Sequence, residues 1–157
     1  MTAPIVAVVG GGQLARMMTG PATELGITLR VLVESADAAA AFPAHETVVG
    51  LPKDADAVAS LLDGATVVTW EHEHIPAAVF DAAAERAVPA LPSLSALKHA
   101  QDKIVMRSRM DALGLPNPAW AEVATEADVE SFLAAHDGRA VLKTARGGYD
   151  GKGVRVI

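Results

Sequence analysis

Residues 5–13 read Ile5-Val6-Ala7-Val8-Val9-Gly10-Gly11-Gly12-Gln13, and this stretch decides the fold of the chain. Five apolar residues, most of them β-branched, predict a strand buried on both faces, and the strand stops at three consecutive glycines. A helix should begin near Gln13, where its first N–H groups lack partners within the helix. Because glycine permits a tight turn and close approach of the backbone, the turn predicts an anion-binding site.

The same turn fits a nucleotide-binding fingerprint. The spacing Gly10-x-Gly12-x-x-Ala15 matches the dinucleotide pattern, whose third position accepts Gly or Ala for close packing of helix on strand. A second expected strand, residues 28–33, ends at Glu34, about where a ribose-binding acid belongs. The first half therefore supports a mononucleotide or a dinucleotide site, or a tight turn without ligand. A nicotinamide-dependent dehydrogenase and a noncatalytic nucleotide-binding module are the alternative functions.

Composition limits the class of protein. The chain has 157 residues, a hydrophobic content of 51% and a net charge of −6, which argues against a nucleic-acid partner. The absence of cysteine excludes disulfides, thiolate zinc sites and cysteine nucleophiles. No basic leader precedes the first strand, and no apolar run reaches the roughly 18 residues of a membrane span. We expect a cytoplasmic protein without a membrane partner.

The first half alternates strands and helices. Strands are expected at residues 5–9, 28–33, 47–50 and 66–69, and helices at 13–25, 55–62 and 76–87. Pro21 lies inside the first helix and is expected to kink or divide it. This alternation predicts a parallel sheet with helices on both faces.

The pattern changes at residues 88–93, where two prolines bracket a short extended piece, and this change suggests a domain boundary. The elements expected after it are helices at 94–100 and 102–113, a strand at 119–123, a helix capped by Thr125 and Asp128, and strands at 140–143 and 153–157. The last two strands with the loop between them predict a hairpin.

The hairpin loop, residues 147–153, is the most specific signal in the chain. It reads Gly-Gly-Tyr-Asp-Gly-Lys-Gly, so backbone N–H groups and one mobile positive charge are available to an oxyanion. Lys143 stands at the exit of the preceding strand and shares a face with Val141, which suggests a cleft beside the loop. The structural alternatives are a flexible hairpin tip and a solvated lysine.

Acidic residues and histidines follow the strand at 66–69, at the end where open parallel sheets bind ligands. Strand alternation sends Glu71 and Glu73 one way and His72 and His74 the other. The carboxylates could accept hydrogen bonds from an amine or from sugar hydroxyls, or could supply negative charge before the helix at Pro76. The two histidines lack a third ligand, so no metal site is predicted.

Four ordered motifs carry a resemblance to a known family. They are Gly10-Gly11-Gly12-Gln13-Leu14-x-Arg16-Met17, Thr69-x-Glu71-x-Glu73-His74, Gln101-Asp102-Lys103 and Lys143-Thr144-x-x-Gly147-Gly148-Tyr149-Asp150-Gly151-Lys152-Gly153. Together they resemble the 5-(carboxyamino)imidazole ribonucleotide synthases, ATP-grasp enzymes of purine biosynthesis. The resemblance implies an α/β fold: a Rossmann-like pre-ATP-grasp domain over residues 1–98, then linker helices and the first part of an ATP-grasp domain over 99–157, apparently truncated. Ala15 stands where the family usually has glycine, which the packing role tolerates.

The resemblance also implies roles for these residues. The phosphate of 5-aminoimidazole ribonucleotide would be held by Gly11, Gly12, Gln13 and Leu14. Its aminoimidazole and ribose would be lined by Glu71, Glu73 and Tyr149. ATP would be contacted by Lys103, Lys143, Gly148, Tyr149, Asp150, Gly151, Lys152, Gly153 and Val154. No catalytic base is assigned from the sequence.

The implied reaction joins ATP, bicarbonate and 5-aminoimidazole ribonucleotide through carboxyphosphate, giving the N-carboxylated ribonucleotide, ADP and phosphate. Mg²⁺ is implied as cofactor, with its acidic ligands expected outside these 157 residues. We therefore expect this chain to be inactive alone, and the complete enzyme to be a homodimer.

Overall fold

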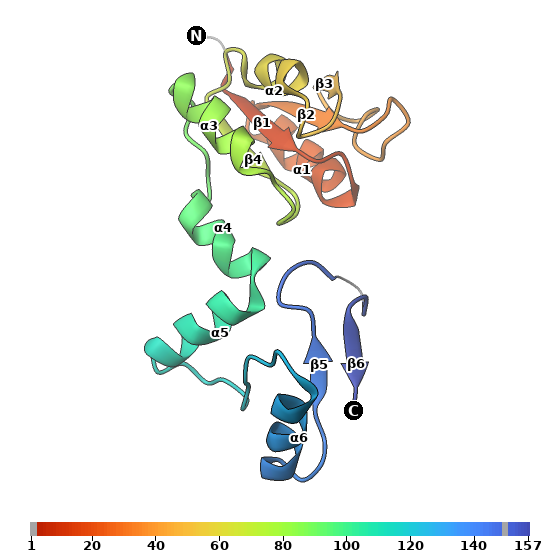
Figure 1. The fold of residues 1–157 in the computed structure, drawn as a ribbon. Coiled ribbons are helices and arrows are strands. Elements are labelled where there is room, and N and C mark those ends of the chain that lie inside the picture. The colour runs from red at the N-terminus through yellow and green to blue at the C-terminus, as the bar shows by residue number, and fades with distance from the viewer. Residues whose placement is uncertain (1–2, 149–150) are drawn as a thin grey trace. The chain divides into compact units, whose positions relative to one another are not determined.

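The computed structural model describes residues 3–148 and 151–157 (Figure 1). The chain forms two compact units, Met1–Leu94 and Ser95–Ile157. The sequence predicted a domain boundary between residues 98 and 99, which lies inside the helix that begins at Leu94.

A four-stranded parallel sheet forms the centre of the first unit. Its strands are β1 (Ile5–Val9), β2 (Thr28–Val33), β3 (Glu46–Val49) and β4 (Val67–Trp70), in the spatial order β3-β2-β1-β4. β1 is central and pairs Val9 with Leu32 on one side and with Trp70 on the other. The predicted parallel sheet is confirmed, and its carboxyl edge collects the ends of β1, β2 and β4.

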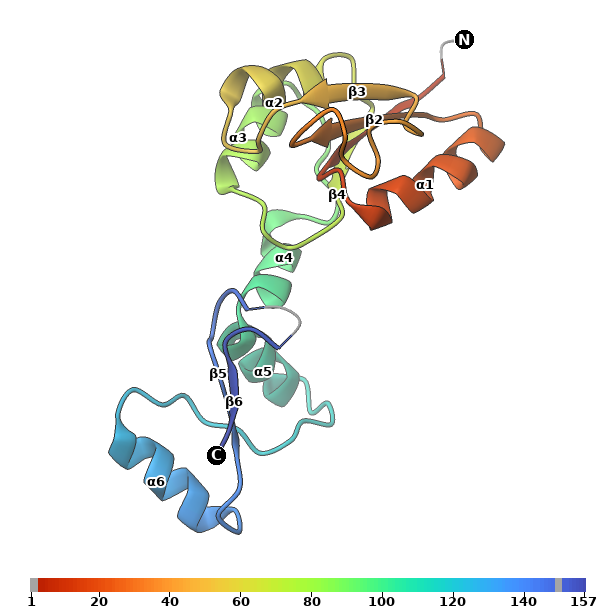
Figure 2. The same cartoon turned by 90° about the vertical axis from the view of Figure 1, so that its right-hand side faces the viewer.

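Helices cover both faces of this sheet, as the alternation predicted (Figure 2). α1 (Gln13–Glu24) lies on one face, and α2 (Ala55–Leu62) and α3 (Ala77–Glu85) lie on the other. On the α1 face, Ala15 and Ala22 are buried in one cluster with Val8, Val31 and Val33. Small side chains on α1 therefore allow the helix to pack closely on β-branched residues of the sheet.

Pro21 does not divide α1, which is continuous to Glu24. Proline lacks the N–H that would bond to the carbonyl of Met17, but both residues are exposed, so water can solvate that carbonyl. The helix continues beyond the proline, since Leu25 N–H donates to the Pro21 carbonyl at 3.0 Å.

The second unit contains α5 (Lys103–Ala112), α6 (Glu126–Ala135) and the antiparallel hairpin of β5 (Val141–Lys143) and β6 (Val154–Val156). α4 (Leu94–Gln101) begins at the boundary. The predicted capping box is present at the start of α6 and the predicted hairpin is confirmed. Within the described residues of this unit, Leu97 is the buried hydrophobic residue, and the hairpin residues are exposed.

The predicted strand at residues 119–123 is wrong. This segment has no regular secondary structure and forms no ladder with any strand in the described part of the chain. Side chains hold it instead: Asp111 of α5 accepts hydrogen bonds at 2.7 Å from the Asn117 amide and from the Trp120 indole. Favourable strand residues do not make a strand without a partner, because the ladder supplies the hydrogen bonds.

No helix within residues 3–148 and 151–157 combines the length and hydropathy that a bilayer span requires.

Candidate functional site

The glycine turn and Glu71 meet at the carboxyl edge of the sheet. Gly10, Gly11 and Gly12 follow β1, and Glu71 follows β4, the neighbouring parallel strand. The Glu71 N–H extends the ladder by donating to the Val9 carbonyl at 3.2 Å. Because parallel neighbours end at the same edge, residues 59 apart in sequence become adjacent.

The Glu71 carboxylate lies on the N-terminus of α1. Its Oε1 accepts from the Gly12 N–H at 2.6 Å and its Oε2 from the Ala15 N–H at 3.0 Å. Gly12 is the N-cap residue of α1 and has no side chain to cap the helix. Among the described residues no cation pairs with Glu71, so its charge is offset by the helix N–H groups.

The three glycines make room for these neighbours. A Cβ on Gly10 or Gly12 would lie 2.7 Å from Cγ or Oε1 of Glu71, respectively. A Cβ on Gly11 would lie 2.5 Å from Cγ1 of the buried Val33. Gly10 has a φ of +106°, which a side chain would strain. The close approach predicted for an external ligand is therefore made, within the chain, by Glu71 and Val33.

Two exposed residues at the start of α1 keep N–H groups that a ligand could reach. Gln13 and Leu14 are exposed, and their backbone N–H groups have no acceptor within residues 3–148 and 151–157. Glu34, the predicted ribose-binding acid, is exposed directly after β2 at the same edge. The edge thus presents two N–H donors together with carboxylates that accept hydrogen bonds.

The predicted alternation after β4 is wrong, because the strand ends at Trp70 and residues 71–73 form bends. Glu73 lies beside His74, with Oε1 and Nε2 3.5 Å apart, and the His74 N–H donates to His72 Nδ1 at 3.2 Å. The Glu71 carboxylate lies at the N-terminus of α1, whereas the sequence suggested that its charge would lie before the helix that begins at Pro76. No cluster of three or more histidine or acidic side chains in the described part of the chain could hold a metal ion.

The second unit joins the start of α5 to the chain after β5. The Lys103 Nζ donates to the Gly147 carbonyl at 2.9 Å, and the Lys103 N–H donates to the Ala145 carbonyl at 2.9 Å. The Arg146 guanidinium nitrogen lies 3.7 Å from Asp102 Oδ2. The Asp102 carboxylate also caps α5 by accepting from the N–H groups of Ile104 and Val105. Two predicted ATP ligands, Lys103 and the glycine loop, are therefore neighbours within this unit.

Gly148 and Gly153 of the glycine loop lie close to Thr144. A Cβ on Gly153 would lie 2.6 Å from Thr144 Oγ1, and the Thr144 N–H donates to the Gly153 carbonyl at 2.9 Å. A Cβ on Gly148 would collide with the Lys152 carbonyl oxygen. Lys143 is exposed on β5, opposite Val154 of β6. The predicted ligands Tyr149 and Asp150 lie outside the described residues.

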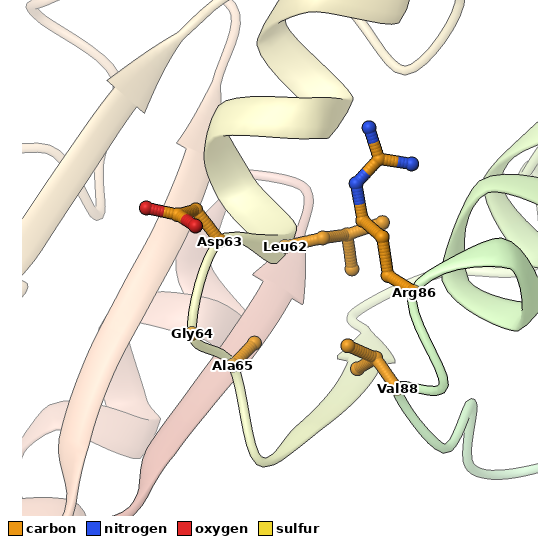
Figure 3. Close-up of a pocket in the computed structure, with 6 residues that line it drawn as sticks. All are labelled: Leu62, Asp63, Gly64, Ala65, Arg86 and Val88. Atoms are coloured by element: carbon orange, nitrogen blue, oxygen red, sulfur yellow. The ribbon is translucent and has the colours of Figure 1, made fainter.

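A shallow pocket of about 290 Å³ lies at the opposite, amino-terminal end of β4 (Figure 3). Its lining residues are Leu62, Asp63, Gly64, Ala65, Arg86 and Val88. Figure 3 shows the charged ends of Asp63 and Arg86 pointing apart, and the Arg86 guanidinium donates to the Ala82 carbonyl at 3.1 Å. Polar groups do not converge in this pocket, so the candidate site remains the glycine turn and the glycine loop.

The open parallel sheet, with a glycine turn that opens a helix at its carboxyl edge, defines an α/β protein of the nucleotide-binding class. Residues 3–101 match the model of the ribonucleotide synthetase pre-ATP-grasp domain. This match spans more than half of the sequence, and the chain belongs to that family.

Named relatives agree with this assignment. The N5-carboxyaminoimidazole ribonucleotide synthase of Mycobacterium tuberculosis is 46% identical over 154 residues, which cover 98% of this chain and 36% of that protein. A crystal structure of N5-carboxyaminoimidazole synthetase from Staphylococcus aureus complexed with ADP has a TM-score of 0.88 and 27% identity, covering 98% of this chain and 41% of that one. A crystal structure of the synthase from Aspergillus clavatus in complex with ADP and 5-aminoimidazole ribonucleotide has a TM-score of 0.73 and 27% identity. It covers 94% of this chain and 40% of that one.

The resemblance seen in the four motifs is confirmed, as is the fold class of a Rossmann-like pre-ATP-grasp domain followed by the start of an ATP-grasp domain. The chain spans little more than a third of the length of the curated relatives it matches. The family assignment does not support the nicotinamide-dependent dehydrogenase that the fingerprint alone left open.

Proposed function

We propose that these 157 residues supply the pre-ATP-grasp domain and the first part of the ATP-grasp domain of a ligase. The ligase would carboxylate 5-aminoimidazole ribonucleotide with bicarbonate at the expense of ATP. One observation carries this proposal: each unit contains its own set of glycines at which a side chain would collide with neighbouring atoms, Gly10–Gly12 in the first unit and Gly148 with Gly153 in the second. The ADP and 5-aminoimidazole ribonucleotide named for the Aspergillus clavatus relative are two ligands of the kind that two such sets of glycines could hold.

In the first unit we assign the ribonucleotide phosphate to the N–H groups of Gln13 and Leu14, which have no acceptor in the described part of the chain. Free N–H groups at a helix N-terminus donate to phosphate oxygens, and these two are separate from the two N–H groups that Glu71 accepts from. Gly11 and Gly12 shape the turn without side chains. Glu73 lies beside His74 at this edge, and its carboxylate can accept hydrogen bonds from the amine or the ribose hydroxyls.

In the second unit we assign the ATP phosphates to the glycine loop and the adjacent lysines. The N–H groups of Gly148, Gly151 and Gly153 with Val154 form the cradle, and the positive φ angles of these three glycines favour glycine over any residue with a side chain. Lys103, Lys143 and Lys152 supply positive charge that offsets the charge of the phosphates. Tyr149 and Asp150 belong to the same proposal on resemblance alone.

Bicarbonate as the carboxyl donor, Mg²⁺ as the metal, a homodimeric assembly and a cytoplasmic location are proposals from the same family relationship. The described residues do not fit a magnesium site, since no acidic cluster among them could hold a metal ion. No step of the reaction is therefore assigned to a metal in this chain. We also expect the isolated 157-residue chain to release no phosphate from ATP when all three substrates are present.

The test uses a chain of the relatives' full length that carries these residues. Lys143→Ala should weaken ATP binding about tenfold or more, because a charge-assisted hydrogen bond is lost, while ribonucleotide binding is unchanged. Lys53→Ala is the matched control, since Lys53 is an exposed lysine of the first unit. Isothermal titration measures both ligands separately. Equal losses for ATP and ribonucleotide, or tight binding of NADH in a fluorescence titration, would contradict the proposal.

A further inference from the structure

We propose that Glu71 is a positioning residue: its carboxylate is an internal anion that fixes the glycine turn and leaves the N–H groups of the exposed residues Gln13 and Leu14 to a ligand. The capping role stands on the geometry alone. Its consequence for the ribonucleotide rests on the function proposed above.

The Glu71 carboxylate bonds to two segments of the chain, the glycine turn and the first turn of α1. The Gly12 N–H belongs to the turn and the Ala15 N–H to the first turn of α1, and Glu71 accepts from both. Glu71 is itself fixed by its N–H bond to Val9 of β1. The start of α1 is therefore fixed to the end of the sheet through one side chain. A ligand meets donors that are already oriented, which lowers the ordering cost of binding.

The charge of Glu71 also restricts what can bind. Its carboxylate occupies the N-terminal N–H groups of α1, where dinucleotide-binding proteins place a pyrophosphate. A second anion at the same point would meet a like charge. The N–H groups of the exposed residues Gln13 and Leu14 remain, and two donors suit a single phosphate group.

The glycines support this assignment. A Cβ at position 10 or 12 would fall within 2.7 Å of a Glu71 side-chain atom, so two of the three glycines are needed to admit Glu71 itself. Glu73 provides the contrast, since it lies in the same bend but pairs with His74. The roles of Glu71 and Glu73 therefore differ because their contacts differ, although both belong to the same motif.

The experiment compares Glu71→Ala with Glu73→Ala in the full-length chain. Removing the Glu71 carboxylate leaves the Gly12 and Ala15 N–H groups without an acceptor, together with a space the size of a small carboxylate. Sodium formate should therefore raise the melting temperature of Glu71→Ala saturably, since a ligand that binds only the folded state stabilises it by mass action. Sodium chloride at equal ionic strength is the salt control. Wild type and Glu73→Ala should show no formate-specific increase.

The kinetic measurement separates positioning from general structural damage. Glu71→Ala should raise the KM for the ribonucleotide about tenfold or more, with the KM for ATP changed less than about twofold, and formate should lower the raised KM. If the alanine variant does not fold, Glu71→Gln serves, because its amide can accept one of the two hydrogen bonds but not both. It should show a smaller increase in KM.

A melting temperature of Glu71→Ala equal to that of Glu73→Ala and insensitive to formate would overturn the capping role. A formate-dependent melting temperature with an unchanged ribonucleotide KM would overturn its catalytic consequence. A full-length chain that binds neither ATP nor the ribonucleotide would instead refute the proposed function. The capping role of Glu71 would then still be tested by the effect of formate on the melting temperature.

Discussion

Gly11→Ala should destabilise the first unit strongly, although the substitution adds one methyl group. The new Cβ would lie 2.5 Å from Cγ1, 2.9 Å from Cβ and 3.0 Å from Cα of Val33. Val33 is fully buried, so its side chain has no open space to enter. Overpacking of this kind costs about 1–3 kcal/mol, and the contact with Cα, which no rotamer change relieves, places the expected cost at about 2 kcal/mol or more.

Val33→Ala removes the atom of closest approach and completes a double-mutant cycle. Alone, it deletes two buried methyl groups and should cost about 2–3 kcal/mol through lost burial and a cavity. In the double variant the methyl group added at position 11 enters part of that cavity. The combined loss should therefore be smaller than the sum of the single losses by about 1 kcal/mol. The coupling is incomplete, because the 2.9 Å approach to Val33 Cβ remains.

Urea unfolding followed by circular dichroism measures these free energies, and each 1 kcal/mol should shift the melting temperature by about 4–8 °C for a unit of this size. Gly20→Ala is the matched control. Gly20 lies within α1, and apart from its chain neighbours and the helix backbone nothing lies within 4 Å of the added Cβ. Alanine favours a helix over glycine, but Pro21 disfavours a helical residue with a Cβ before it, so this variant should stay within about 1 kcal/mol of wild type. A Gly11→Ala variant within about 0.5 kcal/mol of wild type, or strict additivity in the cycle, would refute the reasoning.

Three other substitutions test local features. Asp54→Ala removes the cap of α2 and should cost about 1 kcal/mol in urea unfolding. Arg30→Met should cost about 1–3 kcal/mol in the same assay, because the guanidinium bonds Glu46 at 2.5 Å and two carbonyls at the end of α2. Hydrogen bonds from Asn117 and Trp120 hold the pKa of Asp111 below its usual range. Its stabilisation is thus complete above the unfolded pKa of about 4 and lost as pH falls through the folded pKa, so Asp111→Asn should remove this part of the acid dependence of Trp120 fluorescence.

Elements with a strong local signal were predictable. The strand at residues 5–9 and the capping box at Thr125 each depend on neighbours within a few residues, and both are present as expected. The segment at 119–123 shows the limit of local information, since strand formation needs a partner that the sequence does not name.

The candidate site was predictable in its parts but not in its contacts. The motifs identified Glu71, Lys103 and the two sets of glycines. Nothing in their spacing indicated that Glu71 would cap α1 from 59 residues away, or that the Lys103 ammonium would bond to the Gly147 carbonyl. A signal was available in hindsight: Gly12 is an N-cap without a side chain, so the first N–H groups of α1 required an acceptor from elsewhere.

The sequence by itself determined the alternation of strands and helices, the parallel sheet and the two glycine-rich segments, because hydrophobic period and backbone freedom are local properties. The tertiary structure alone decided which carboxylate meets which N–H groups. Parallel pairing of β1 with β4 sets the carboxyl ends of distant strands side by side, and only that register places Glu71 on α1 and leaves Gln13 and Leu14 with free donors.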